Sequence, residues 1–425
     1  MTQYDNELDR LVEQLNRSSL TPPRAGSPAK SDPAKPDPAK IDPPKIDLDR
    51  LESYSANYPE RSSTGTYNDR PSLDHVLALA AQRNASDVLL LAGVPPTFRI
   101  KGTLASSGSP AVSPEDLRFM LMGALSPAQA AELEEQRSID LSFSRGSIGR
   151  FRANFHYQRG TLAASIRLLP AQVPTIDSLH LPASLALLTE KRQGLILVTG
   201  PTGSGKTSTL AALLDLVNTR RHDHVITIED PVEYQHLNRS AIIEQIEVGR
   251  DTPTFAHAVR AVLRQDPDVI LIGEMRDGET MTAALTAAET GHLVLSSLHT
   301  NDASQALSRI LDLLPSSHQQ QIRQQLSLSL LAILSQQLLP AADRLHRYPA
   351  VEILLATPGI RNLIRTGHDH QIRHLVATGR GEGMQTMEQS LADLVQTGRI
   401  TLETAYAHSA NTKELAQYLG RELPA

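Results

Sequence analysis

The 425-residue sequence contains no cysteine and no tryptophan, and aromatic residues make up only 4% of it. Without cysteine, the chain can form neither disulfide bonds nor cysteine-based zinc sites, which suits a reducing cytoplasm. The scarcity of aromatic side chains leaves few platforms on which nucleic-acid bases could stack. A formal net charge of −6 also argues against nucleic acid as the main partner.

Long apolar runs are missing as well. The longest candidate, 326–339, is interrupted by serine and glutamine residues, so it falls short of the roughly 18 apolar residues that a membrane span needs. The N-terminus lacks the basic-then-apolar order of a secretory signal peptide. The sequence therefore predicts a soluble protein of the cytoplasm.

Residues 1–70 differ in composition from the rest of the chain. They include the run DPAKPDPAKIDPPKID, in which aspartate recurs every five residues. Proline at this frequency removes backbone donors and favours an extended chain. We interpret residues 1–70 as a disordered extension rich in proline, aspartate and lysine, with a short amphipathic helix at its start.

Two folded parts are predicted to follow. In residues 71–175, short strand-like runs surround one helical stretch near 113–136, which indicates a small α+β domain. In residues 176–425, short apolar strands first alternate with amphipathic helices, a pattern typical of a parallel sheet covered on both faces. After Pro315 we expect a mainly helical C-terminal region. The predicted class is α/β.

The segment GPTGSGKT, residues 200–207, fits the pattern G-x-x-x-x-G-K-[ST] between a predicted strand and a predicted helix. Backbone N–H groups of such a loop surround phosphate oxygens at a helix N-terminus. The lysine reaches the β- and γ-phosphates, and the threonine hydroxyl binds Mg²⁺. We predict that ATP and Mg²⁺ bind here, and that the nucleotide contacts are Thr202, Gly203, Ser204, Gly205, Lys206, Thr207 and Ser208.

Polar side chains stand where three further strands end. Glu274 closes the apolar run VILIG, which is the Walker B arrangement, so we predict it as the catalytic carboxylate and, with Thr207, as a metal-site residue. Glu229 and His299 follow two other strands of the same predicted sheet. Ligands of a parallel sheet bind at the carboxyl ends of its strands, so both residues are predicted to act in catalysis.

These segments together resemble a known family. GPTGSGKT, ITIEDPVEY, LRQDPDVILIGEMRD, TAAETGHLV and HLVLSSLHT are similar to the ATPases that power type II secretion and type IV pili. The segments ASDVLLLAGVPPTFRIKG, RFRANFHYQRG, GIRNLIRTG and GMQTMEQSLADLV resemble the PilT family of pilus retraction ATPases in particular.

The resemblance implies a homohexameric ring whose subunits have a PAS-like N-terminal domain and a RecA-like ATPase domain. It implies that Arg152 and Arg167 of the N-terminal domain approach the phosphates, as an arginine finger does. It further implies docking on an inner-membrane pilus platform protein, and so a peripheral place at the inner membrane. For the segment 359–365 the resemblance implies a helix that couples hydrolysis to pilus movement without serving catalysis, and we expect its two arginines, Arg361 and Arg365, to be dispensable for folding.

Three alternatives remain open at this point. The chain could be a PilT paralogue that assists retraction, or a secretion-type assembly ATPase, although the absence of cysteine excludes the tetracysteine module usual in the latter. A protein of another class, a hexameric nucleic-acid translocase on the same RecA-like core, is the third. Stimulation of ATP hydrolysis by DNA or RNA would identify it.

Overall fold

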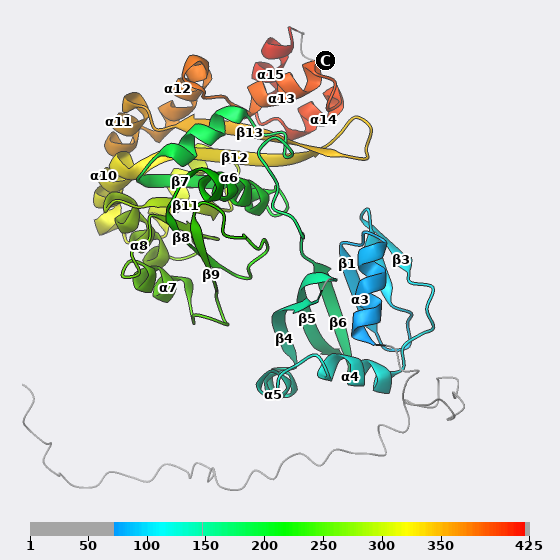
Figure 1. Cartoon of the computed structure of the whole chain (residues 1–425). Coiled ribbons are helices and arrows are strands. Elements are labelled where there is room, and N and C mark those ends of the chain that lie inside the picture. The colour runs from blue at the N-terminus through cyan, green and yellow to red at the C-terminus, as the bar shows by residue number, and fades with distance from the viewer. Residues whose placement is uncertain (1–71, 147, 421–425) are drawn as a thin grey trace, which may run out of the picture. The chain divides into compact units, whose positions relative to one another are not determined.

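The structure is a computed structural model that describes residues 72–146 and 148–420. Two β-sheets organise these residues, one N-terminal and one C-terminal (Figure 1), and the predicted α/β class is confirmed. The predicted extension and its opening helix lie outside the described residues. In the part of the chain that is described, no helix combines the length and apolarity required to cross a bilayer.

The N-terminal sheet has six antiparallel strands in the order β3-β2-β1-β6-β5-β4. Its strands and helices are β1 (Asp87–Leu91), β2 (Thr97–Ile100), β3 (Thr103–Ser106), β4 (Ser138–Arg145), β5 (Gly149–Gln158), β6 (Thr161–Leu168), α3 (Leu73–Gln82), α4 (Pro114–Met122) and α5 (Pro127–Gln136). The single helical stretch expected near 113–136 is two helices, because Ser126 caps a new helix that begins at Pro127. The short strand β3 was not predicted.

Side chains alternate across this sheet. On β5, Phe151, Ala153 and Phe155 are buried in a core shared with α3, α4 and α5. Arg152, between them, is exposed on the other face. One face of the sheet therefore carries the core, and the opposite face presents polar side chains.

The C-terminal sheet has seven strands in the order β13-β12-β7-β11-β10-β8-β9. Every neighbouring pair is parallel except β12 with β13. The first five strands of this sheet, in chain order, are β7 (Gly194–Thr199), β8 (His224–Glu229), β9 (Ile242–Glu247), β10 (Val269–Ile272) and β11 (Leu293–Leu298). The helical elements among them are η2 (Ala183–Glu190), α6 (Lys206–Arg220), α7 (Phe255–Val262), α8 (Gly278–Glu289) and α9 (Ala303–Asp312).

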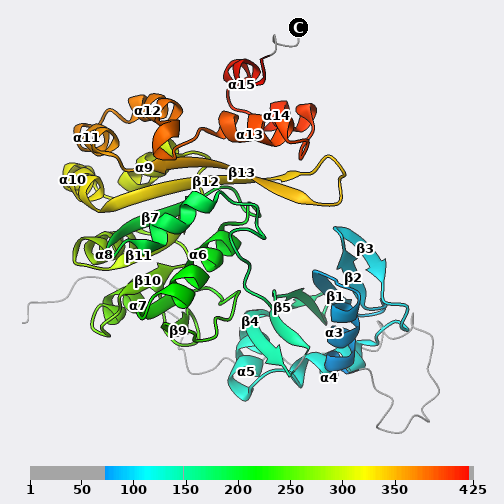
Figure 2. The same cartoon turned by 45° about the horizontal axis from the view of Figure 1, so that its top comes forward.

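Both faces of this sheet are covered, as the apolar strands predicted. On β7, Leu195 and Leu197 belong to a core with α7, α8 and α9, whereas Ile196 and Val198 belong to a core with α6 and η2. Figure 2 shows α6 on one side of the sheet and α7 and α8 on the other. The three-layer arrangement leaves the strand ends free to carry the polar residues of a site.

The region after Pro315 is rich in helices, as expected, but it also supplies two strands that were not predicted, β12 (Leu330–Pro340) and β13 (Arg347–Leu355). β12 pairs with β7, the strand that precedes the glycine-rich loop. Leucine and glutamine favour helices, but pairing with β7 overrides this local preference. The remaining α-helices are α10 (Gln319–Ser329), α11 (Pro358–Thr366), α12 (Ile372–Thr378), α13 (Met387–Gln396), α14 (Leu402–His408) and α15 (Thr412–Leu419).

Helix α11 carries the segment 359–365. Ile360 and Ile364 are buried, so the apolar stripe does face the core. Arg361 serves the fold as well, because its guanidinium donates to the carbonyl oxygens of Ser327 and Leu328, each at 2.7 Å, at the end of α10. The last carbonyls of a helix have no partner within the helix. The hypothesis that both arginines stand apart from the fold is therefore wrong for Arg361.

We predict that Arg361→Ala destabilises the protein, because the carbonyls of Ser327 and Leu328 lose a charged donor. The expected loss is about 2 kcal/mol, or a fall in Tm of about 4–8 °C for a domain of this size. Arg365→Ala is the matched control, since Arg365 is exposed and donates to Asn362 on its own helix. Differential scanning fluorimetry compares the two, and equal Tm values would contradict the capping role.

Candidate active site

The glycine-rich loop 200–207 joins β7 to α6, as predicted. All three of its glycines have backbone angles that other residues rarely adopt, and the two nearest to β12, Gly200 and Gly205, have φ of +145° and +93°. Gln336 on β12 packs against both: a Cβ on Gly200 would lie 2.3 Å from the Gln336 carbonyl oxygen, and one on Gly205 would lie 2.9 Å from its Nε2 atom. The loop is thus held closely against β12.

Lys206 begins α6, and its side chain is buried. The ammonium donates to the carbonyl oxygens of Gly200 at 2.8 Å and Pro201 at 3.1 Å. Burial lowers the pKa of Lys206, and the nearby carboxylate of Glu274 acts in the opposite direction. A buried cation held by the loop itself is placed to attract an anion that enters the loop.

Glu274, Lys206 and His299 come together at the strand ends. The Nδ1 atom of His299 lies 3.5 Å from the ammonium of Lys206, and its Nε2 atom lies 3.4 Å from Glu274 Oε2. The other oxygen of Glu274 pairs with Arg276 at 2.5 Å. The imidazole therefore bridges the loop lysine and the Walker B carboxylate.

Strand register explains why these side chains meet. Ile272 at the end of β10 lies opposite Ser296 on β11, so Glu274 and His299 follow the ends of neighbouring strands. Two buried hydroxyls fasten these ends together, because Ser296 donates to the Ile272 carbonyl and Ser297 to the Gly273 carbonyl, both at 2.7 Å. Neither serine was singled out from the sequence.

Glu229 ends β8, the neighbour of β10 on its other side. It is 9% exposed and accepts hydrogen bonds from Thr227 at 2.7 Å and from Gln245 at 3.2 Å. Burial raises the pKa of Glu229, although these two donors work against the rise. Its carboxylate thus bonds to β8, to β9 and to the backbone of Glu233, whereas His299 contacts Lys206 and Glu274 directly.

The other predicted loop residues differ in their surroundings. Thr202 and Gly203 are exposed, and Thr207 is partly exposed in the first turn of α6. The hydroxyl of Ser204 is buried and has no hydrogen-bond partner among the described residues. Ser208 meets the Tyr234 hydroxyl at 2.8 Å.

Sequence reasoning missed a layer of support supplied by β12. Gln336 accepts a hydrogen bond from Thr209 in the first turns of α6 at 2.8 Å. Its neighbour Ser335 accepts one from Thr199, the residue before the loop, at 3.0 Å. Both side chains are buried. Polar residues inside an apolar strand were the available signal, but only the sheet order shows what they contact.

Arg152 and Arg167 belong to the N-terminal sheet, where they lie opposite each other on β5 and β6. Both are exposed on the face away from the helices. Arg167 donates to Asp87 on β1 at 2.9 Å. The two arginines are thus cross-strand neighbours, and Arg167 in addition pairs with a carboxylate.

The residues of the loop fit a nucleoside triphosphate and a magnesium ion. The unpartnered Ser204 hydroxyl, the buried Lys206 cation and the N-terminus of α6 can all serve phosphate oxygens. The Thr207 hydroxyl and the Glu274 carboxylate are hard oxygen donors of the kind that Mg²⁺ prefers. A metal there would take its remaining ligands from phosphate and water.

The chain is similar to known proteins in sequence and in structure. The family model described as "Type II/IV secretion system protein" matches residues 70–418. The chain is 40% identical to the type IV pilus ATPase PilU of Pseudomonas aeruginosa over 82% of this chain and 92% of that protein. It is also 40% identical to the type IV pilus retraction ATPase PilT of the same organism, over 78% and 96%. Among solved structures, the pilus retraction motor PilT with bound ADP matches with a TM-score of 0.77 and 44% identity, over 82% of this chain and 99% of that one.

We predict that Gly200→Ala weakens nucleotide binding by about tenfold or more, since about 1.4 kcal/mol of distortion in the loop suffices. The added methyl group would collide with the Gln336 carbonyl and push the loop from β12. Gly398→Ala is the control, because Gly398 also has a positive φ, +69°, but open space around its Cβ position. Titration with a fluorescent ADP analogue should show an unchanged dissociation constant for the control. An unchanged constant for Gly200→Ala would refute the close-packing argument.

Proposed function

The chain belongs to the type II/IV secretion system protein family, and on that premise we propose that it is an ATP-hydrolysing motor subunit that drives type IV pilus retraction. The observation that carries the proposal is the bridge of His299 between Lys206 and Glu274 beside a glycine-rich loop. Binding of a triphosphate uses the loop lysine, and activation of the attacking water uses a residue close to the γ-phosphate, the place that Glu274 takes here. Two relatives that the chain matches over 92% and 96% of their length are named a type IV pilus ATPase and a type IV pilus retraction ATPase.

In the proposed reaction, the loop N–H groups and Lys206 hold the phosphates. The carboxylate of Glu274 accepts a proton from a water molecule whose oxygen forms a bond to the γ-phosphorus. The bond from that phosphorus to the bridging oxygen breaks, and ADP and inorganic phosphate result. His299 orients Glu274, and a bound Mg²⁺ would supply charge neutralisation at the phosphates, held through Thr207 and Glu274. Glu229 is proposed to assist from β8.

We assign Arg152 and Arg167 to neutralisation of charge at the γ-phosphate, as the family resemblance implies. Their exposure on one face of the N-terminal sheet supports the assignment, because it leaves both guanidinium groups accessible. Removal of transition-state charge neutralisation lowers kcat more than affinity. A substitution of either arginine that lowers both equally would count against the role.

The assembly and location of the motor are further parts of the proposal. We propose a homohexameric ring of subunits, each with an N-terminal domain ending near residue 175, docked through an inner-membrane pilus platform protein at the cytoplasmic face. Size-exclusion chromatography with light scattering tests the ring, and co-purification with the platform protein tests the docking. A monomer in the presence of ATP analogue would contradict the first.

An accessory role beside a second retraction ATPase is the competing proposal. It is favoured by one observation, the equal identity of 40% to PilU and to PilT. Identity therefore does not separate the driver of retraction from its paralogue, and the distinction requires an experiment in cells.

Glu274→Gln is expected to lower kcat by about a hundredfold or more, the usual effect of losing a general base, while ATP still binds. Lys206→Ala should instead abolish nucleotide binding. Glu279→Gln, an exposed glutamate on α8 paired with Arg260, is the matched control and should retain normal turnover. Phosphate release and binding of a fluorescent ATP analogue provide the two measurements. Normal turnover by Glu274→Gln would remove its catalytic role.

Deletion of the gene in its source organism tests the direction of the motor. Retraction predicts cells with excess surface pili and no twitching, restored by the wild-type chain but not by Glu274→Gln. Cells without pili would indicate an extension motor instead. Normal pili and normal twitching would indicate an accessory paralogue.

A further inference from the structure

Glu352 is a buried carboxylate on β13 that none of the proposed catalytic steps uses. Its exposed fraction is 6%. One of its oxygens accepts a hydrogen bond from the backbone N–H of Ala303 at 3.0 Å. Ala303 is the first residue of α9, and the preceding Asp302 caps the same helix by accepting from Gln305. A carboxylate at a helix N-terminus satisfies an unpaired donor and is stabilised by the helix dipole.

This contact fixes the segment that carries His299. Only three residues separate His299 from Ala303, so the start of α9 determines where the segment from His299 to Asp302 lies. Glu352 is also paired across the sheet with Ser335 of β12, and Ser335 holds Thr199 immediately before the glycine-rich loop. One pair of strand positions therefore holds both sides of the site, the loop and the histidine segment.

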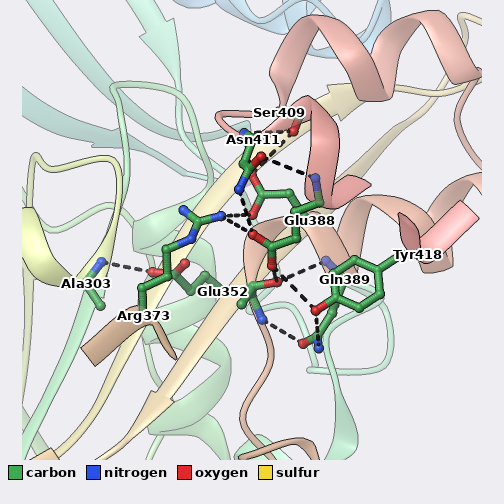
Figure 3. A network of polar contacts seen from close by, with 10 residues as sticks. Ala303, Glu352, Arg373, Glu388, Gln389, Ser409, Asn411 and Tyr418 are labelled. Atoms are coloured by element: carbon green, nitrogen blue, oxygen red, sulfur yellow. Dashed lines mark hydrogen bonds and ion pairs between the residues drawn. The ribbon is translucent and has the colours of Figure 1, made fainter. Parts of the chain in front are cut away.

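On its other side, Glu352 faces the C-terminal helices (Figure 3). Arg373 of α12 pairs with Glu388 of α13 and with Glu414 of α15, each at 2.7 Å. Glu388 is completely buried, and its second oxygen accepts from the Asn411 N–H at 3.0 Å. A cavity of about 380 Å³ adjoins the network and is lined in part by Pro201, Asp302, Glu352, Arg373 and Glu388. The cavity thus reaches from the glycine-rich loop to the C-terminal helices.

Burial and the surrounding charges together set the pKa of Glu352. Burial is the main cause that raises the pKa of Glu352 to about 7, and the negative charges of Asp302 and Glu388 act in the same direction. The Ala303 N–H and the positive charge of Arg373 oppose them. Arg373, the cation that opposes the rise in pKa, lies on α12. A displacement of α12 therefore changes the ionisation of Glu352, which accepts the N–H at the start of α9.

We propose that Glu352 is a positioning residue for ATP hydrolysis, which holds His299 in place through the start of α9 and connects it to Arg373 of the C-terminal helices. The inference rests on the proposed ATPase function. Through this connection, the C-terminal helices bias the rate of hydrolysis without touching the nucleotide.

Glu352→Ala removes the acceptor for the Ala303 N–H. Its kcat should fall about tenfold with a KM for ATP within about twofold, because a misplaced His299 affects the transition state more than binding. Glu352→Gln keeps the acceptor but never carries charge. Since an ionised acceptor binds an N–H more strongly, the ratio of wild-type to Glu352→Gln kcat should rise from near unity at about pH 6 to about threefold at about pH 8.

Stability should change in the opposite direction from activity. The folded-state pKa of Glu352 lies above the unfolded value of 4.5, so its contribution to stability is full below 4.5 and is lost as pH rises through about 7. Glu352→Gln does not ionise and should therefore have a higher Tm than wild type at about pH 8, where its kcat is lower. A purely structural role would make Tm and kcat fall together.

Asp393→Asn is the control, because Asp393 lies on α13 and pairs at the surface with Arg380, outside the Glu352 network, and its kcat should stay within about twofold of wild type. A pH-independent ratio for Glu352→Gln, or equal changes in kcat and nucleotide affinity for Glu352→Ala, would overturn the inference. If Glu352→Ala does not fold, the pH profile and Tm of Glu352→Gln decide alone. An inactive wild-type protein would instead refute the proposed ATPase function.

Discussion

The parallel register of β7, β11, β10 and β8 is the constraint on which the site depends. It aligns four strand ends, so that the glycine-rich loop, His299, Glu274 and Glu229 leave the sheet at one edge. A slip of one residue would turn each strand's side chains to the opposite face. Gly273 shows how close the fit is, because a Cβ there would lie 3.3 Å from the Ile228 carbonyl of the neighbouring strand.

The polar residues buried in this sheet follow from the same constraint. A buried hydroxyl or amide destabilises a core unless it is hydrogen-bonded. Ser296 and Ser297 are hydrogen-bonded to the end of β10, and Ser335 and Gln336 to Thr199 and Thr209, which lie just before and just after the glycine-rich loop. These polar side chains within apolar strands hold the loops at fixed positions. Hydrogen bonds are directional, so they fix the position of a loop more closely than apolar contacts do.

The sequence predicted the parts of the site that are local in the chain. The strand, glycine loop and helix at 194–220, and the Walker B strand ending before Glu274, are recognisable because a few consecutive residues carry the whole pattern. The supports were not predictable in this way, since Thr199 and Ser335 are 136 positions apart and Thr209 and Gln336 are 127 apart. Arg361 shows the same limit: helical periodicity gave its face, but not the carbonyls of α10 that occupy its guanidinium. The roles assigned to Arg152 and Arg167 stay predictions.

Buried charge distinguishes the C-terminal helices from an ordinary cover over a sheet. Glu388 has no exposed surface, and Arg373 is the cation that pairs with it. Replacing such a pair by apolar side chains is often neutral or stabilising, so stability alone does not explain why it is there. Unlike apolar packing, a charge pair has an electrostatic effect on a third group, here Glu352. The size of that effect depends on the distance between the helices and Glu352. In a motor, that dependence gives helix position a direct electrostatic path to the residues that orient His299.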